Sequence, residues 1–326
     1  MRCKVVGDGS SNSGMVVSPR FEPMESESRI EAVLEQIVTK ATAAPCPVHL
    51  AEAIRYAVFP GGGRVRPGLC LAVAKACGDR EPALADAAAV AVELLHCASL
   101  VQDDLPCFDD APLRRGQPSL HMRFGEAIAI LVGDALIVMA FGAVSAHVHE
   151  GEQAAACAQI LRTLAEAAGT PAGIAAGQAW ESEPSVDVVA YHHAKTAALF
   201  EAAAVAGAIA GGGKPEGWRQ AGVSLGAAYQ IADDLADALG ESGTLGKPIH
   251  QDGNKARPSV VASLGVDGAI KQLDQWLGQA KQSIPECSGR GNVEEFLNIA
   301  AARLCPPALR QKDFTTESTE NAEGAE

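Results

Sequence analysis

Two clusters of aspartates in this sequence are suited to bind a divalent cation. They comprise Asp103, Asp104, Asp109 and Asp110 in the first cluster, and Asp233, Asp234 and Asp237 in the second. Asp233 and Asp237 share one face of a helix, because residues four apart are neighbours on a helix surface. Such stacked carboxylates repel one another, and burying them without a cation is costly. Since Mg²⁺ prefers carboxylate oxygens and also binds substrate phosphates, the clusters predict a magnesium site. The alternative is two solvated acidic surfaces.

Basic residues accompany the acidic clusters. The segment 61–67, GGGRVRP, places Arg64 and Arg66 on a glycine-rich turn, and Arg114 and Arg115 follow the first cluster closely. A glycine-rich turn exposes backbone N–H groups and lets an anion approach the chain. Further cations on later elements are Lys195, Lys247 and Arg257. Together these groups predict a site for a polyanionic ligand bridged by metal, although each basic residue taken alone is better explained as an ordinary surface charge.

The hydrophobic pattern places both clusters on helices. Apolar residues recur at helical spacing from Ile30 to Ile37, and no alternating strand-like run bounded by hairpin turns is present. Further helices are expected at 83–101, 126–147, 151–168, 187–210, 216–239, 266–282 and 291–303. We therefore predict one all-α domain over residues 28–305. Polar, aperiodic composition predicts disorder in residues 1–27 and 306–326.

Residues 127–146 form an apolar run long enough to be mistaken for a membrane span. Asp134 lies in the middle of the run, and a carboxylate at mid-bilayer is costly. We interpret the run as a buried helix of a large bundle and predict no transmembrane segment.

Charge and cysteine usage exclude several classes of protein. The formal net charge of −14 argues against a nucleic-acid-binding protein, whose binding surface is basic. The nine cysteines are scattered and none forms a C-x-x-C pair, which argues against a zinc site or a disulfide framework. Without a recognisable secretory signal, this usage predicts a protein of the reducing cytoplasm.

Several motifs together resemble those of trans-prenyl diphosphate synthases. Residues 93–121 read ELLHCASLVQDDLPCFDDAPLRRGQPSLH and residues 229–237 read YQIADDLAD, similar to the two aspartate-rich regions of that family. FPGGGRVRP, FGEAIAILVGDAL, GQAWE, HHAKTAALF and GKPIHQDGNKARPS follow in the family's order. The resemblance covers residues 28–303 and is strongest to the geranylgeranyl diphosphate synthases of bacterial carotenoid and bacteriochlorophyll pathways.

The resemblance implies an isoprenoid synthase fold, a bundle of about ten or more helices around a central cavity, assembled as a homodimer. It implies a prenyltransferase of the farnesyltranstransferase type that joins isopentenyl diphosphate to dimethylallyl, geranyl and farnesyl diphosphates. The product would be geranylgeranyl diphosphate, and about three Mg²⁺ ions would serve each active site.

By position, the resemblance also assigns roles to single residues. The metal ligands would be Asp103, Asp104, Asp109, Asp233, Asp234 and Asp237. The catalytic residues would be the first five of these aspartates together with Lys195. The allylic diphosphate would contact Arg114, Lys195, Thr196, Gln230 and Lys247. Isopentenyl diphosphate would contact Arg66, His96 and Arg115, with Arg64 as a further candidate. Ala98, five residues before Asp103, would set product length, because the family's farnesyl synthases carry an aromatic floor there.

Three residues depart from the family pattern. Gly63 replaces a usual lysine and so removes one contact to isopentenyl diphosphate, which Arg64 or Arg66 could supply instead. Gln102 replaces a common histidine, and Pro112 replaces a common acidic or polar residue. Four rival functions remain open: a farnesyl synthase, a longer-chain synthase, a terpene cyclase and a regulatory subunit of a heteromeric synthase. The second D-D-x-x-D disfavours the cyclase, and two intact aspartate motifs disfavour the regulatory subunit.

Overall fold

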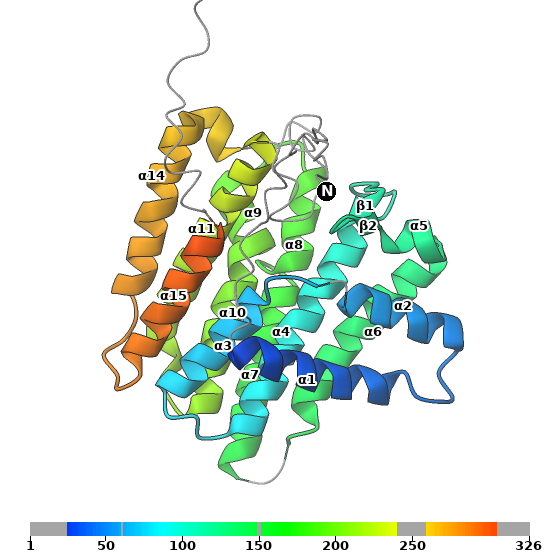
Figure 1. Ribbon diagram of the computed structural model, residues 1–326, viewed down its shortest axis with the longest axis horizontal. Coiled ribbons are helices and arrows are strands. Elements are labelled where there is room, and N and C mark those ends of the chain that lie inside the picture. Colours follow the sequence, from blue (N-terminus) through cyan, green and yellow to red (C-terminus); the bar gives the residue numbers. More distant parts are fainter. Residues whose placement is uncertain (1–24, 60, 149–150, 240–258, 305–326) are drawn as a thin grey trace, which may run out of the picture.

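Helices account for most of the residues that the computed structural model describes, namely 25–59, 61–148, 151–239 and 259–304 (Figure 1). The α-helices are α1 (Glu25–Ala41), α2 (Val48–Val58), α3 (Val65–Ala76), α4 (Pro82–Asp103), α5 (Leu120–Phe124), α6 (Glu126–Ser145), α7 (Glu152–Ala168), α8 (Ile174–Ala179), α9 (Val188–His192), α10 (Ala198–Gly211), α11 (Arg219–Leu239), α14 (Val260–Gln282) and α15 (Arg290–Leu304). Short 3₁₀ helices η1 (Trp180–Ser182) and η3 (Pro215–Trp218) and a π-helix, η2 (His193–Ala197), connect some of them. The predicted all-α fold is confirmed.

One small hairpin is an element that the sequence pattern did not reveal. Strands β1 (Leu113–Arg114) and β2 (Gln117–Pro118) pair antiparallel, with Arg114 opposite Gln117. The turn between them contains Arg115 and Gly116, both at positive φ. Two-residue strands are too short to show an alternating pattern, so only the folded chain reveals the hairpin.

Two helices begin several residues before the predicted positions, and α2, α5 and α8 have no counterpart among the predicted ranges. Helix α1 begins at Glu25, inside the segment expected to be disordered, and the Glu27 carboxylate pairs with Arg303 of α15. Helix α14 begins at Val260 rather than at 266, but Gly265 breaks it with a φ of 70°. The sequence therefore located the second half of this kinked helix. Residues 1–24 and the predicted disordered tail, 306–326, lie outside the described residues.

The core of the bundle consists of α3, α4 and α10, which contact one another pairwise. The packing of α10 on α3 is close because Gly207 and Gly211 lie against the backbone of α3. An added Cβ at Gly207 would lie 2.2 Å from the carbonyl oxygen of Cys70, and one at Gly211 would lie 2.5 Å from that of Ala74. Any side chain at these two positions would force the helices apart.

Helix α6 differs from the fully buried helix that we predicted. Val132 and Leu136 are completely buried, whereas Ile130, Leu131 and Val138 are 50%, 51% and 71% exposed. Among the described residues, three stretches are long and apolar enough to cross a membrane by length and composition: α4, α6 and Val188–Gly211. The protein itself buries 78% of the apolar window in α4 and 83% in Val188–Gly211, but only 39% in α6. The prediction that α6 is wholly buried is therefore wrong for one of its faces.

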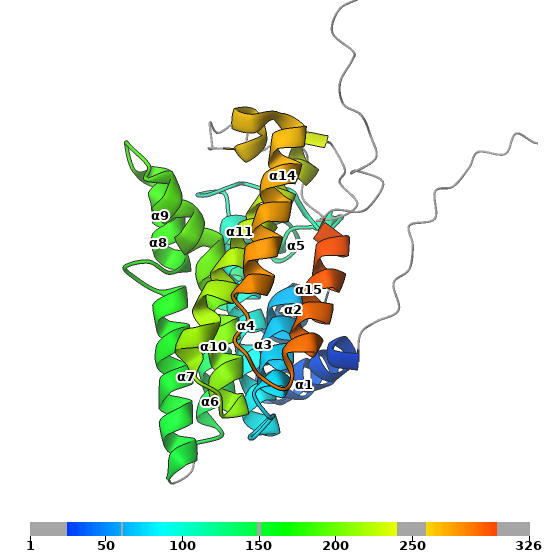
Figure 2. The same cartoon turned by 90° about the vertical axis from the view of Figure 1, so that its left-hand side faces the viewer.

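Both aspartate clusters lie at one end of the bundle. Asp103 is the last residue of α4, and Asp233 and Asp237 lie near the end of α11. Figures 1 and 2 show the hairpin, α9 and the start of α14 at this same end. The long apolar helices thus bring polar groups that are distant in sequence to a common end.

Candidate active site

The backbone after α4 folds back so that the aspartates of the first cluster lie together. The Asp109 N–H donates to the Asp103 carbonyl oxygen over 2.9 Å, and the Ala111 N–H donates to the Asp104 carbonyl oxygen over 3.2 Å. Asp103 and Asp109 are both partly exposed, whereas Asp104 is buried. Of the three predicted metal ligands in the first cluster, Asp103 and Asp109 are therefore the accessible ones, and the neighbouring Asp110 is exposed as well.

Asp104 and Arg114 are each other's partners. The Arg114 Nε donates to the Asp104 Oδ1 over 3.0 Å, and a second bond runs from Nη2 to the same carboxylate. Burial raises the pKa of Asp104, and the hydrogen bond and charge of Arg114 oppose that rise. Burial also acts to lower the pKa of Arg114, but the hydrogen bond and charge of Asp104 outweigh it, so that the pKa is raised. The buried side chain of Asp104 thus anchors Arg114 and the hairpin, a role that neither residue was assigned from the sequence.

In the second cluster, Asp234 links α11 to α14. Its side chain is buried and accepts hydrogen bonds from the Gln230 Nε2 (3.0 Å) and from the Val260 N–H (2.8 Å). The Thr196 hydroxyl donates to the Gln230 Oε1 over 2.7 Å. Three residues predicted to act on substrate or metal therefore form one hydrogen-bonded chain, and Asp233 and Asp237 are the partly exposed carboxylates of this cluster.

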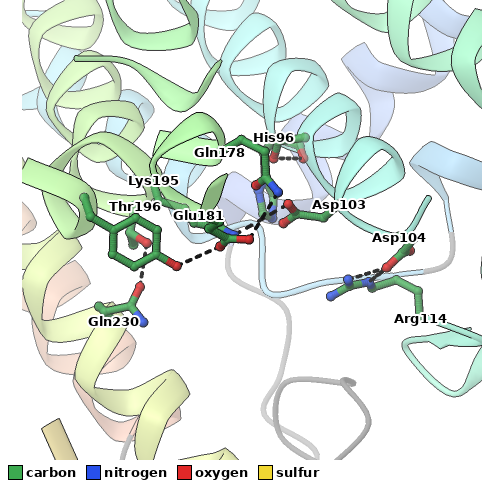
Figure 3. A network of polar contacts seen from close by, with 11 residues as sticks. His96, Asp103, Asp104, Arg114, Gln178, Glu181, Lys195, Thr196 and Gln230 are labelled. Carbon is green, nitrogen blue, oxygen red and sulfur yellow. Dashed lines mark hydrogen bonds and ion pairs between the residues drawn. The ribbon is translucent and has the colours of Figure 1, made fainter. Parts of the chain in front are cut away.

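Lys195 connects the first cluster to a carboxylate that the sequence analysis did not select. The Lys195 ammonium lies 3.7 Å from the Asp103 Oδ1 and forms a direct ion pair with Glu181 (Figure 3). Lys195 and Thr196 lie in the π-helix η2, an element that often occurs at functional sites. The signal for Glu181 was present in the motif GQAWE, but one acid in an unassigned motif did not identify a partner.

The residues assigned to isopentenyl diphosphate lie partly together. The Arg66 Nη1 is 3.4 Å from the His96 Nε2, and the Arg66 guanidinium lies over the rings of Phe200 and Tyr229, 4.4 and 5.0 Å from their centroids. The seven-residue spacing of His96 and Asp103 places both on one face of α4. These contacts fix an arginine beside a histidine on the helix that ends at the first cluster.

Arg115 reaches the glycine-rich turn from the hairpin. Its Nη1 donates to the Gly61 carbonyl oxygen. An added Cβ at Gly62 would lie 2.8 to 3.0 Å from the Arg115 guanidinium, and Gly62 has a φ of 148°. A guanidinium therefore packs on the turn in which Gly63 stands in place of the family's lysine.

The Arg64 side chain points into the interior of the bundle rather than to the aspartate clusters. Its guanidinium is buried and donates to Glu31, to Glu93 (2.5 Å) and to the Val58 carbonyl oxygen (2.8 Å). Burial acts to lower the pKa of Arg64, but the charge of Glu93 and the hydrogen bonds to Glu31 and Glu93 together outweigh it, so that the pKa is raised. We therefore correct the assignment of Arg64 from substrate binding to a structural role that ties α3 to α1 and α4. Lys247, also predicted to bind diphosphate, and Arg257 lie outside the described residues.

The donor set fits magnesium that shares its ligands with a substrate. Asp103, Asp109, Asp233 and Asp237 offer the oxygen ligands that Mg²⁺ prefers. Within the described ranges, no group of three or more histidine, cysteine, aspartate or glutamate side chains is arranged to hold a metal ion by itself. Phosphate and water oxygens would have to complete the coordination sphere, which is how Mg²⁺ is usually bound.

Comparison with known proteins identifies clear relatives. A family model described as Polyprenyl synthetase matches residues 47–289. The chain is 50% identical over 283 residues to geranylgeranyl diphosphate synthase of Cereibacter sphaeroides, covering 87% of this chain and 98% of the relative. Identity to the Rhodobacter capsulatus geranylgeranyl diphosphate synthase is 46% over 281 residues, covering 86% and 96%. A geranyltransferase from Helicobacter pylori, solved with magnesium and isoprenyl diphosphate, superimposes with a TM-score of 0.71 at 27% identity, covering 86% of this chain and 99% of that one.

The structural role of Arg64 leads to a stability prediction. Arg64→Met removes the cation between two carboxylates, so we expect a loss of about 3–5 kcal/mol in unfolding free energy because Glu93 becomes a buried unpaired charge. As a matched control, Arg80→Met removes the Arg80–Glu152 pair, whose side chains are 63% and 83% exposed, and should cost less than about 1 kcal/mol. Urea unfolding followed by circular dichroism measures both. Unchanged stability of Arg64→Met with a raised KM for isopentenyl diphosphate would restore the original assignment.

Proposed function

This chain belongs to the polyprenyl synthetase family, and from that premise we propose that it is a magnesium-dependent geranylgeranyl diphosphate synthase. It joins isopentenyl diphosphate to allylic diphosphates, namely dimethylallyl, geranyl and farnesyl diphosphate. The single observation that carries the proposal is the 3.7 Å approach of the Lys195 ammonium to Asp103. Next to it lies the hydrogen-bonded chain from Thr196 through Gln230 to Asp234. This network joins the first aspartate motif to the second across two helices, α4 and α11.

The chain's own residues suggest how the allylic carbon–oxygen bond breaks. Asp103, Asp109, Asp233 and Asp237 would hold magnesium, which would supply positive charge against the negative charge that develops on the departing diphosphate. Lys195 and Arg114 are cations at the same end of the bundle and stabilise that charge by donating hydrogen bonds. Because Arg114 is anchored by Asp104, its guanidinium is already oriented and requires little reorganisation.

The second half of the reaction depends on orientation of isopentenyl diphosphate. Arg66, His96 and Arg115 hold its diphosphate so that its double bond attacks the allylic cation, which requires a near-attack geometry. The departing diphosphate then accepts the proton that the new intermediate loses. The apolar helices α4 and α10 exclude water from the cation.

The rival functions are less consistent with these features. A regulatory subunit has no need of two intact aspartate motifs, and both lie at one end of the bundle here. A terpene cyclase differs in its second motif. A farnesyl or longer-chain synthase shares the whole site and differs only in the length of product that it releases, so the choice between them depends on Ala98.

Ala98 is a candidate for the residue that limits product length. It is 1% exposed and lies on the face of α4 that also carries Gln102, four residues later. The Gln102 side chain contacts α6, since an added Cβ at Gly133 would lie 3.4 Å from the Gln102 Cγ. A prenyl chain that extends from Asp103 along α4 toward α6 would therefore meet Ala98. Its small side chain leaves room for the fourth isoprene unit.

We also propose that the protein is a cytoplasmic homodimer that supplies carotenoid synthesis. The exposed apolar side chains Ile130, Leu131 and Val138 on α6, with Met122 (59% exposed) of the neighbouring α5, support a self-association surface. Free thiols at the described cysteines fit a reducing compartment. The place in carotenoid synthesis is based on sequence resemblance alone.

Product analysis tests the proposed function. Purified protein is incubated with labelled isopentenyl diphosphate, Mg²⁺ and each allylic primer, and the dephosphorylated products are sized by chromatography. We expect the twenty-carbon alcohol as the main product from each primer. A fifteen-carbon or longer main product would replace the proposal with the corresponding synthase, and no product from any primer would refute prenyl synthesis.

The two aspartate clusters should both be required. Asp103→Ala and Asp233→Ala each remove one accessible carboxylate, and we expect turnover to fall at least about 100-fold, comparable to the loss of a group that stabilises developing charge. Circular dichroism should show unchanged helicity. As a control, Asp267→Ala changes an acid of α14 outside the two clusters and should leave turnover unchanged. Near-normal turnover in either cluster variant, or full activity in excess EDTA, would contradict a site that depends on both clusters.

Enlarging Ala98 should shorten the product. In Ala98→Tyr we expect the main product to change to farnesyl diphosphate, because a ring at this buried position would block elongation toward α6. Ala98→Ser, a change of similar size, is the control and should keep the twenty-carbon product. If Ala98→Tyr is folded and still yields the twenty-carbon product, Ala98 does not limit chain length.

A further inference from the structure

Glu181 occupies a central position among the polar groups of the site, although no sequence motif assigned it a role. Its carboxylate forms an ion pair with the Lys195 ammonium. It also accepts hydrogen bonds from the Tyr191 hydroxyl over 2.8 Å and from the Gln178 Nε2 over 3.4 Å. These partners come from η2, α9 and α8, and Figure 3 shows the side chains of Glu181 and Asp103 near one another. Its side chain is 18% exposed, as is that of Asp103.

The backbone fixes this position. Gly177, four residues before Glu181, lies so close to η2 that an added Cβ would be 2.6 Å from the Lys195 backbone nitrogen. Only glycine permits this approach of α8 to the π-helix. The Glu181 carboxylate and the Lys195 ammonium are thus held together by the packing of two helical segments rather than by flexible side chains alone.

Two carboxylates therefore compete for one ammonium. Lys195 is paired directly with Glu181 and is 3.7 Å from the Asp103 oxygen. If Glu181 lost its charge, Asp103 would be the remaining ion-pair partner of Lys195 among the described residues, and the ammonium would move onto it. A cation paired closely with Asp103 would oppose the binding of a divalent metal there by charge repulsion.

We propose that Glu181 is a positioning residue that holds the Lys195 ammonium away from Asp103, so that Asp103 can bind metal while Lys195 donates to the allylic diphosphate. The identity of the diphosphate in this inference rests on the proposed function. The effect of Glu181 on metal affinity does not depend on the proposed function. Glu181 acts through Lys195 and contacts neither the substrate nor the metal.

Metal binding without turnover tests the inference directly. Full-length wild type, Glu181→Gln, Lys195→Met and the double variant are titrated with Mn²⁺, and free Mn²⁺ is measured by electron paramagnetic resonance. We expect Glu181→Gln to weaken Mn²⁺ binding about tenfold, within the range of coupling between neighbouring charged groups. In the Lys195→Met background the same change should have an effect of less than about twofold, because no ammonium remains to move onto Asp103.

Two control variants separate positioning from general charge effects. Glu183→Gln removes an equal charge from an exposed residue on the same turn and should leave Mn²⁺ affinity unchanged. Glu181→Asp keeps the carboxylate and should restore most of the affinity lost in Glu181→Gln. In steady-state assays, Glu181→Gln should raise both the Mg²⁺ concentration for half-maximal activity and the KM for farnesyl diphosphate. It should leave the KM for isopentenyl diphosphate unchanged.

The outcomes are distinct. Undiminished Mn²⁺ affinity in Glu181→Gln overturns the inference, and so does an equal loss in the presence and absence of Lys195, which would make Glu181 a metal ligand itself. If the Mn²⁺ cycle behaves as expected but wild type forms no prenyl product, the proposed function fails and the positioning role stands. If wild type is active and the cycle shows no coupling, the positioning role alone fails.

Discussion

Repulsion between carboxylates is the constraint on which this structure depends. Acidic side chains gather at the ends of two apolar helices, and such a group is stable only if cations lie between its members. The fold supplies them from segments distant in sequence: Arg114 from the hairpin binds Asp104, and Lys195 from the π-helix lies between Asp103 and Glu181. The protein's cations neutralise part of this charge, and the accessible aspartates remain suited to a divalent metal shared with diphosphate.

The remaining architecture keeps these groups in register. Helix α10 approaches α3 through Gly207 and Gly211, and α8 approaches the π-helix through Gly177. A buried ion pair between Arg64 and Glu93 fixes the start of α3, from which Arg66 reaches His96 on α4. Small residues at contact points and buried charge pairs thus set the positions of the residues predicted to bind substrate.

Sequence motifs identified which residues gather at the site, but they did not identify partners. Asp104 and Arg114 were assigned separately to metal and diphosphate, yet they bind each other, and Asp234 caps the start of α14. Arg64 was assigned to substrate as a substitute for the lysine that Gly63 replaces, but a φ of 43° at the start of α3 accompanies its turn into the interior. Adjacent positions in a motif can face opposite sides of the chain, and only the fold shows which side is buried.

The sequence by itself determined the helical class, the places of most of the long helices and the two aspartate clusters, because these depend on local periodicity and on the chemistry of neighbouring side chains. The tertiary structure alone decided the pairing of Lys195 with Glu181, the hairpin that carries Arg114 and the exposed face of α6. Each of these depends on contacts between segments far apart in the chain. Whether a carboxylate binds a metal, an arginine or a backbone N–H is decided by which group lies within hydrogen-bonding distance, and that distance is a property of the packed helices.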